Sequence, residues 1–154
     1  MLPETLIDPK ERVLELLPQK KPFRFLDKIQ SISDEEITGE YTFKKDEFFY
    51  SGHFPGNPVT PGVILLETMA QTGVVALGIY LSFQNNNYND DILTFFTEAE
   101  VEFLIPIFPE ETVTIVGKKI FFRHNKLKSY IELKKSDGRV AACGTLSGMG
   151  VKKS

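Results

Sequence analysis

The stretch Gly52-His53-Phe54-Pro55-Gly56-Asn57-Pro58-Val59-Thr60-Pro61-Gly62-Val63 runs directly into the apolar segment Ile64-Leu65-Leu66-Glu67-Thr68-Met69-Ala70-Gln71. It contains one of the two histidines of the chain, and its prolines and glycines are unusually dense. Because proline fixes φ and glycine permits conformations closed to other residues, this stretch should adopt a defined shape rather than act as a plain linker. The pattern predicts a structured active-site loop that leads into a buried helix.

The apolar run after this loop predicts one long central helix, over about residues 61–83. Thr60 suits an N-cap and Pro61 a first helical position. The run is apolar on nearly all sides, which favours a helix in the middle of the fold. At 1.5 Å per residue it would be roughly 30 Å long, which is also the length of a membrane span. Glu67 and Gln71 interrupt the run and no basic cluster flanks it. We therefore expect a core helix and no membrane span.

The other segments indicate one short helix and six strands. A helix is expected over residues 9–16, with Pro9 in its first turn. Segments rich in β-branched and aromatic residues predict strands over residues 23–31, 36–44, 92–104, 112–123, 127–135 and 139–149. Residues 124–126 and 136–138 have the composition of hairpin turns. Successive hairpins make an antiparallel sheet, and a single buried helix requires that sheet to curl around it. The expected class is α+β, in a single domain over residues 1–154.

Composition and charge limit the functional classes. The 154 residues carry a formal net charge of -3, which gives no general attraction to nucleic acid or to an anionic membrane. One cysteine, Cys143, allows no intrachain disulfide, and we interpret it as a small apolar residue of a strand. The N-terminus lacks the basic and then apolar pattern of a signal peptide, so a cytoplasmic location is expected.

Several site classes have no support in the sequence. It has no glycine-rich phosphate loop, no Cys/His zinc spacing and no Gly-x-Ser-x-Gly nucleophile motif. Two histidines and scattered carboxylates do not make a convincing metal site. We therefore expect neither a metal nor a cofactor.

His53 and Glu67 are the residues that suggest chemistry. A histidine titrates near neutrality and can accept a proton. A glutamate among Leu65, Leu66 and Met69 should have its ionised form disfavoured by desolvation, so it could hold a proton and donate it. The loop could fold back to bring the imidazole near that carboxylate, on the same chain or on a partner's. One base and one acid around a dry pocket suit the elimination or addition of water.

Gly62 supplies a candidate oxyanion donor. Its N–H lies in the first helical turn, where no intrahelical carbonyl accepts it, and it points along the positive end of the helix dipole. Glycine has no side chain to block the close approach of a substrate carbonyl.

At these residues the sequence resembles the beta-hydroxyacyl-[acyl-carrier-protein] dehydratases of fatty-acid synthesis, which adopt the hot-dog fold. The blocks Gly52 to Val59, Pro61 to Val63 and Glu67 to Gln71 match the family signature nearly residue for residue. Weaker similarity covers most of the chain. The resemblance implies the dehydration of 3-hydroxyacyl thioesters on acyl carrier protein to trans-2-enoyl thioesters, in fatty-acid or related polyene synthesis.

The resemblance also implies an assembly and a role for each residue. His53 would abstract the α proton, and Glu67 of the partner subunit would protonate the leaving hydroxyl. Gly62 would hold the thioester carbonyl, and the carbonyl of Val59 would set the histidine tautomer. The substrate-binding set would be Gly62, Val59, Phe54 and Gln71. The expected assembly is a double-hot-dog homodimer, which could associate into a trimer of dimers.

Some positions depart from the family pattern. Gln19 and Thr60 replace its usual His and Met. Three carboxylates on one strand face, at Glu98, Glu100 and Glu102, stand where the family often carries basic residues, and they should repel an acidic carrier. Candidate docking residues are instead Lys20, Lys21, Arg24, Arg123, Lys126 and Lys128. Five phenylalanines could line an acyl tunnel, although most are expected in the core: Phe83, Phe95, Phe96, Phe103 and Phe108.

Two other functions stay open on sequence grounds. A hot-dog acyl thioesterase would use Glu67 as base or nucleophile and leave His53 secondary. A non-catalytic acyl-binding subunit would assist an active relative, although the presence of both residues argues against it.

Overall fold

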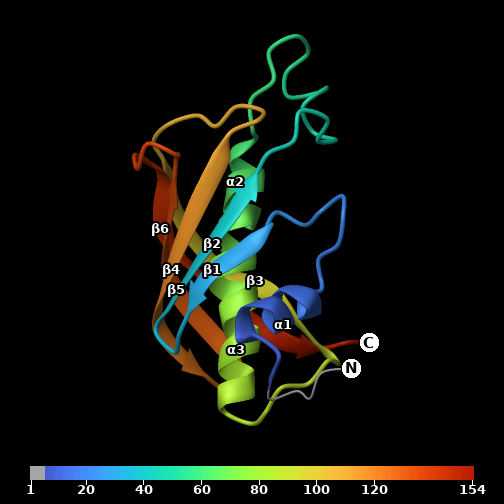
Figure 1. The fold of residues 1–154 in the computed structure, drawn as a ribbon, viewed down its shortest axis with the longest axis vertical. Helices are drawn as coiled ribbons and strands as arrows, with labels where there is room; N and C mark the ends of the chain where they lie inside the picture. Colours follow the sequence, from blue (N-terminus) through green and yellow to red (C-terminus); the bar gives the residue numbers. More distant parts are fainter. Residues whose placement is uncertain (1–5) are drawn as a thin grey trace.

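The computed structural model describes residues 6–154, in which a six-stranded antiparallel sheet curls around one long helix (Figure 1). The strand order is β1-β2-β4-β5-β6-β3. The strands are β1 (Lys28–Ile32), β2 (Glu36–Thr42), β3 (Ile92–Phe103), β4 (Thr112–Arg123), β5 (Lys126–Lys134) and β6 (Val140–Lys152). The structure confirms the predicted α+β class and the sheet wrapped around a central helix.

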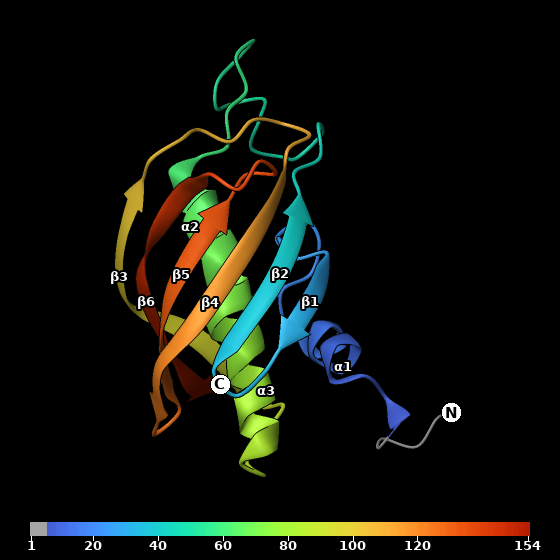
Figure 2. The same cartoon turned by 60° about the vertical axis from the view of Figure 1, so that its left-hand side comes forward.

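The central helix runs along the concave side of the sheet (Figure 2). It comprises α2 (Gly62–Ala70), a π-helical segment η2 (Gln71–Ala76) and α3 (Leu77–Gln84). All six residues of η2 are buried. Burial on every side explains why this run is apolar on all sides. Gly62–Gln84 is long and apolar enough to cross a membrane, but 67% of its most apolar window is buried inside the fold. Such a degree of burial is typical of the core helix that the sequence predicted.

The start of the helix differs from the prediction in one residue. Pro61, not Thr60, is the N-cap, and no side chain caps the helix there. Thr60 was the wrong choice because its hydroxyl bonds to the phenol of Tyr50 instead, at 2.6 Å.

The first strand begins later than predicted, at Lys28 rather than at residue 23. The backbone of the preceding segment is held by a helix side chain rather than by a neighbouring strand. The Phe25 N–H donates to Gln71 Oε1 at 2.7 Å, and Gln71 Nε2 donates to the Phe23 carbonyl at 2.9 Å. Strand propensity in this segment is therefore overridden by a contact with a residue far along the chain.

The peripheral elements largely follow the prediction. Helix α1 (Pro9–Leu16) has the expected bounds, and Asp8 caps it by accepting from the Lys10 N–H. The β4–β5 turn consists of His124 and Asn125, both at positive φ, and the following lysine already belongs to β5. The turn at residues 136–138 contains a glycine at φ 90. Strand β6 extends three residues beyond its predicted end.

Strand β3 is the last strand of the sheet, and no other strand of residues 6–154 pairs with its outer edge. This position corrects the expectation that most of the five phenylalanines lie in the core. Those exposed by 46–55% are Phe95, Phe96, Phe103 and Phe108. Since an edge strand and the loop after it are covered on one side only, their rings are left accessible in the single chain.

Candidate active site

His53 lies in a loop whose backbone is tied at short range. Its N–H donates to the Phe49 carbonyl at 3.1 Å, and its own carbonyl accepts from the Val59 N–H at 2.9 Å. Between them, Phe54 and Asn57 exchange two backbone hydrogen bonds, of 3.0 and 2.8 Å. Gly56, at φ 75, makes the tight turn that this pairing requires. These backbone bonds and the turn at Gly56 give the loop the defined shape that the sequence predicted.

The imidazole of His53 is oriented by the carbonyl of Val59, which lies 2.9 Å from Nδ1. A carbonyl can only accept, so Nδ1 carries the proton in the neutral ring and Nε2 keeps a free lone pair. This is the contact expected for Val59. Phe54, 53% exposed, stacks on the imidazole with ring centroids 4.1 Å apart. The geometry leaves Nε2 able to act as a base.

Glu67 projects from α2 and is only partly accessible. Burial raises the pKa of its carboxyl above the ordinary value, and the hydrogen bond from Gln71 opposes part of that rise. The raised pKa favours a carboxyl that holds its proton, as its apolar surroundings suggested. This direction of the pKa shift is the one that a proton-donating role for Glu67 would need.

Gln71 is fully buried and connects Glu67 to the N-terminal segment. Its Nε2 donates to Glu67 Oε2 at 2.7 Å as well as to the Phe23 carbonyl, while its Oε1 accepts from Phe25 N–H. Both halves of the amide are thus used within the protein. Gln71 therefore fixes one carboxyl oxygen of Glu67, and its predicted contact with substrate stays a prediction.

Gly62 is the first residue of α2, and its N–H has no hydrogen-bond partner among residues 6–154. The ring of Phe103 lies 3.5 Å from the place where a β-carbon at Gly62 would stand. An N–H at the positive end of a helix, beside the ring of Phe103, can donate a hydrogen bond to a developing oxyanion and so stabilise it.

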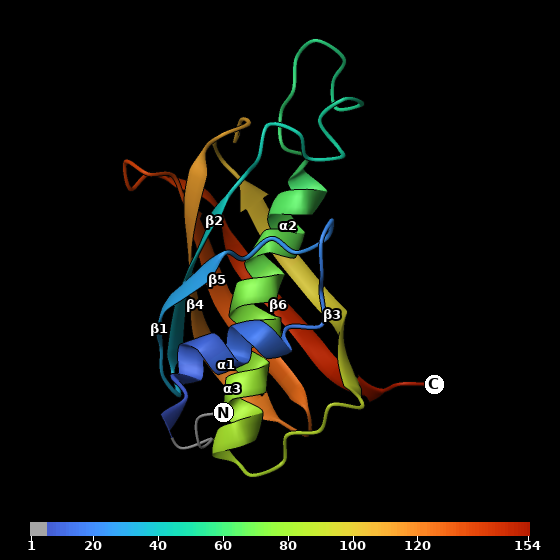
Figure 3. The ribbon, with the colours of Figure 1, turned by 45° about the vertical axis from the view of Figure 1, so that its right-hand side comes forward.

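His53 and Glu67 belong to different parts of the chain, the loop before α2 and α2 itself. The loop that carries His53 extends beyond the end of the sheet, while Glu67 lies on the helix inside it (Figures 1 and 3). The candidate base thus lies on a different part of the chain from the candidate acid and oxyanion donor, and no hydrogen bond links His53 to Glu67 within residues 6–154.

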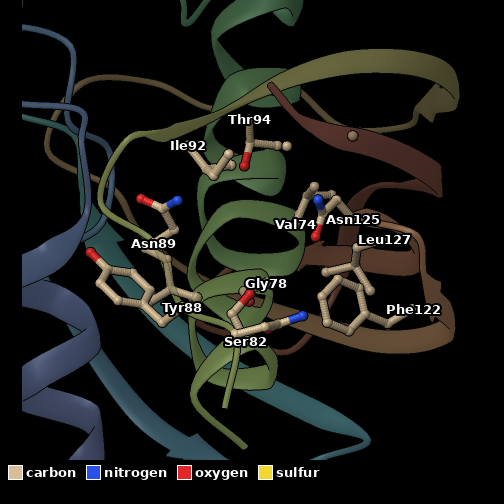
Figure 4. Close-up of a pocket in the computed structure, with 14 residues that line it drawn as sticks. Val74, Gly78, Ser82, Tyr88, Asn89, Ile92, Thr94, Phe122, Asn125 and Leu127 are labelled. Atoms are coloured by element: carbon tan, nitrogen blue, oxygen red, sulfur yellow. The ribbon is translucent and has the colours of Figure 1, made fainter. Parts of the chain in front are cut away.

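Cavities lie both beside the His53 loop and away from it. One of about 530 Å³ is lined in part by Ser51, Gly56 and Pro58 of that loop. Another of about 70 Å³ is found between α3, β3 and the β4–β5 hairpin, and Figure 4 shows Gly78, Thr94 and Asn125 around it. His53, Glu67 and Gly62 do not line it. Over residues 6–154, no three His, Cys, Asp or Glu side chains gather closely enough to hold a metal ion.

Four of the six proposed docking cations make contacts within the described residues. Lys20 donates to the Glu15 carbonyl at 3.3 Å, and the Arg123 guanidinium lies 4.6 Å from the centre of the Phe121 ring. The guanidinium of Arg24 donates to the carbonyls of Leu14 and Leu17, and Lys126 forms an ion pair with Glu98 at 3.1 Å.

Sequence reasoning also missed the buried hydroxyl pair of Tyr50 and Thr60. No local pattern marks that pair, because its two residues belong to opposite ends of an irregular loop.

A model of the FabA-like domain matches residues 17–142. The 3-hydroxyacyl-[acyl-carrier-protein] dehydratase FabZ of Nitratidesulfovibrio vulgaris is 32% identical over 150 residues, which cover 92% of this chain and 90% of that protein. The FabZ of Streptococcus mutans is 32% identical over 139 residues, or 88% of this chain and 93% of the relative. The chain also matches a bifunctional enzyme LpxC/FabZ of Chlorobaculum tepidum at 36% identity, over 67% of this chain but only 21% of that enzyme.

Solved structures share the fold at low identity. The dehydratase heterocomplex ApeI:P from Xenorhabdus doucetiae superposes with a TM-score of 0.76 at 18% identity, covering 92% of this chain and 91% of the other. A hypothetical thioesterase from Streptococcus pneumoniae, solved with coenzyme A, gives a TM-score of 0.59 at 13% identity and covers 82% and 87%. These similarities support the hot-dog architecture alone.

Proposed function

The chain belongs to the FabA-like domain family, and from this premise we propose that it removes water from 3-hydroxyacyl thioesters carried on acyl carrier protein. The observation that carries the proposal is the Val59 carbonyl at 2.9 Å from His53 Nδ1, which leaves Nε2 free to accept a proton. FabZ relatives at about 32% identity, named as 3-hydroxyacyl-[acyl-carrier-protein] dehydratases, support the substrate class.

In the proposed reaction, His53 Nε2 takes a proton from C2 of the substrate. The electron pair of that C–H bond forms the C2–C3 double bond while the C3–O bond breaks. The protonated carboxyl of Glu67 gives its proton to the departing hydroxyl, which leaves as water. The Gly62 N–H stabilises the negative charge that develops on the thioester oxygen. The product is a trans-2-enoyl thioester, and the two residues exchange roles as acid and base in the reverse direction.

We propose that His53 of one subunit works with Glu67 of another in a homodimer. Two observations support this: no hydrogen bond joins the pair within residues 6–154, and the β3 edge is left unpaired with exposed rings at its end. The proposal extends to the cytoplasm as the location and to fatty-acid or related polyene synthesis as the pathway.

The proposal is tested by incubating the purified protein with 3-hydroxyacyl thioesters of several chain lengths, on carrier protein and on coenzyme A, and identifying products by mass spectrometry. We expect the enoyl thioester, and a loss of about 10²- to 10⁴-fold in rate for Glu67→Gln, as is usual for general acid catalysis. Free thiol without enoyl product would instead identify a thioesterase. Binding of the carrier without turnover of any thioester would identify a non-catalytic subunit.

A further inference from the structure

Tyr50 and Thr60 form a buried hydroxyl pair at the base of the His53 loop. Tyr50 Oη lies 2.6 Å from Thr60 Oγ1, and each residue is only 4% exposed. Burial raises the pKa of Tyr50 to about 12, so the phenol keeps its proton at neutral pH and can donate it to the hydrogen bond. Neither hydroxyl is open enough to touch a bound substrate directly.

The pair lies next to both contacts that fix His53. Phe49, whose carbonyl accepts from the His53 N–H, precedes Tyr50 in the chain. Val59, whose carbonyl accepts from the His53 ring, precedes Thr60. A shift of either hydroxyl-bearing residue is thus passed to a histidine contact through a single peptide bond.

Thr60 also connects this loop to the rest of the fold. Its N–H donates to the Ile107 carbonyl at 2.8 Å, in the segment that follows β3. Ile107 is fully buried. The threonine is therefore anchored by its backbone to the core and by its side chain to the opposite end of the loop, which closes residues 50–60 into one unit.

We propose that Tyr50 and Thr60 are positioning residues that fix the Val59 carbonyl against His53 and thereby hold the imidazole in the tautomer with Nε2 unprotonated. The proposed effect on the tautomer rests on these contacts and does not depend on the proposed reaction. The effect on turnover rests on the proposed dehydratase function. Because a misplacement of about 1 Å in a catalytic group can reduce a rate about 10²-fold, a small displacement of His53 suffices.

The experiment compares Tyr50→Phe, Thr60→Val and the double variant with the unmodified protein. ¹⁵N spectra of histidine-labelled protein report the tautomer of His53, and kinetics on a 3-hydroxyacyl carrier substrate separate kcat from KM. For each single variant we expect a mixed tautomer signal and a fall in kcat of about ten- to a hundredfold, with KM within about twofold. The double variant should recover part of the stability, since it leaves no buried hydroxyl without a partner.

Two further variants make the result decisive. Thr60→Ser keeps the hydroxyl and should preserve both the tautomer and kcat. If Tyr50→Phe does not fold, the comparison of Thr60→Ser with Thr60→Val still tests the hydroxyl contact. Thr42→Val breaks the hydroxyl contact of 2.7 Å between Thr42 and Thr112 in the sheet, and should lower stability without changing the His53 spectrum.

An unchanged tautomer and kcat in folded Tyr50→Phe would overturn the proposal, as would an equal spectral change in Thr42→Val. If Thr60→Ser behaved like Thr60→Val, the hydroxyl contact would not be the cause and the proposal would fail. A tautomer change in the variants of a protein without dehydratase activity would instead uphold the positioning pair and reject the proposed reaction.

Discussion

The two connections of the central helix differ in how they are held. The incoming connection, residues 43–61, is tied to distant parts of the fold: Phe43 exchanges backbone bonds with residues Glu110 and Glu111, and Thr60 bonds to Ile107. In the outgoing connection, residues 85–91, Asn85, Asn86 and Asn87 donate to the last carbonyls of α3. One distant bond, from the Lys153 N–H to the Asp91 carbonyl at 2.7 Å, ties its end to the chain after β6.

This difference matches the proposed duties of the two connections. A catalytic base must be held within a fraction of an ångström, so the connection that carries His53 needs anchors outside itself. The outgoing connection carries no proposed catalytic residue, and its first three residues are held by backbone bonds to the end of α3. Substitutions in the incoming connection should therefore change activity more than substitutions in the outgoing connection.

The largest effect is expected from His53→Ala in the incoming connection. Removal of the base should lower the dehydration rate by about 10²- to 10⁴-fold, while the fold persists because the ring is held by one hydrogen bond only. Product formation by mass spectrometry and far-ultraviolet circular dichroism measure the two quantities. Turnover at the unmodified rate would remove His53 from the mechanism.

A smaller but structural effect is expected from Gln71→Leu on the helix itself. The change leaves the Phe25 N–H and the Phe23 carbonyl without their partner, and each buried group so stranded costs about 1–3 kcal/mol. We expect the free energy of unfolding to fall by about 2 kcal/mol or more in urea titrations. Gln84→Leu, at the exposed end of α3, is the matched control and should stay within about 0.5 kcal/mol. Equal losses in the two variants would mean that the amide network does not stabilise the fold.

The pH dependence of stability should reveal Glu67. Its folded-state pKa is raised by burial, so the folded protein binds the proton more tightly than the unfolded chain does. This contribution to stability is fully present below the unfolded pKa and is lost as the pH rises through the folded pKa. The difference in unfolding free energy between the unmodified protein and Glu67→Gln should therefore decrease with rising pH across that interval. A flat or rising difference would contradict the raised pKa.

The smallest effect is expected in the outgoing connection. Asn86 has φ 57, a conformation that glycine adopts at no steric cost, so Asn86→Gly should change stability by no more than about 0.5 kcal/mol and leave the dehydration rate unaltered. Thermal unfolding and the same product assay check both values. A marked loss of activity would show that this connection also controls the site, and the contrast between the two connections would be lost.

Much of this architecture could be predicted because it depends on local patterns. The alternation in β2, the hairpin turns and the long apolar run each determine their element within a few residues of chain. The site residues were recognisable because glycine, proline and histidine lie together in one stretch, and the expected contact between His53 and Val59 is present. The roles of Phe54, Gly62 and Gln71 toward substrate stay predictions.

The misses have a common physical origin in contacts between distant residues. Residues 23–27 have strand propensity, but a side chain from the helix takes their backbone groups. The exposure of Phe95 and Phe103 depends on the place of β3 at the sheet edge, which pairing order decides. Thr60 has a residue type suited to capping a helix, yet a phenol ten positions earlier engages its hydroxyl.

The π-helical segment Gln71–Ala76 gives the central helix two angular phases. Its wide turn is visible in the bond from the Leu77 N–H to the Thr72 carbonyl, five residues back. Since an α-helix turns about 100° per residue, one extra residue taken up in such a turn rotates every later side chain by about that angle. Deleting one residue after Gln71 would rotate Gly78 and Ser82, which line the far cavity, relative to Glu67 and its partner Gln71. The π-helical segment therefore determines how the side chains of α3 are rotated about the helix axis relative to those of α2.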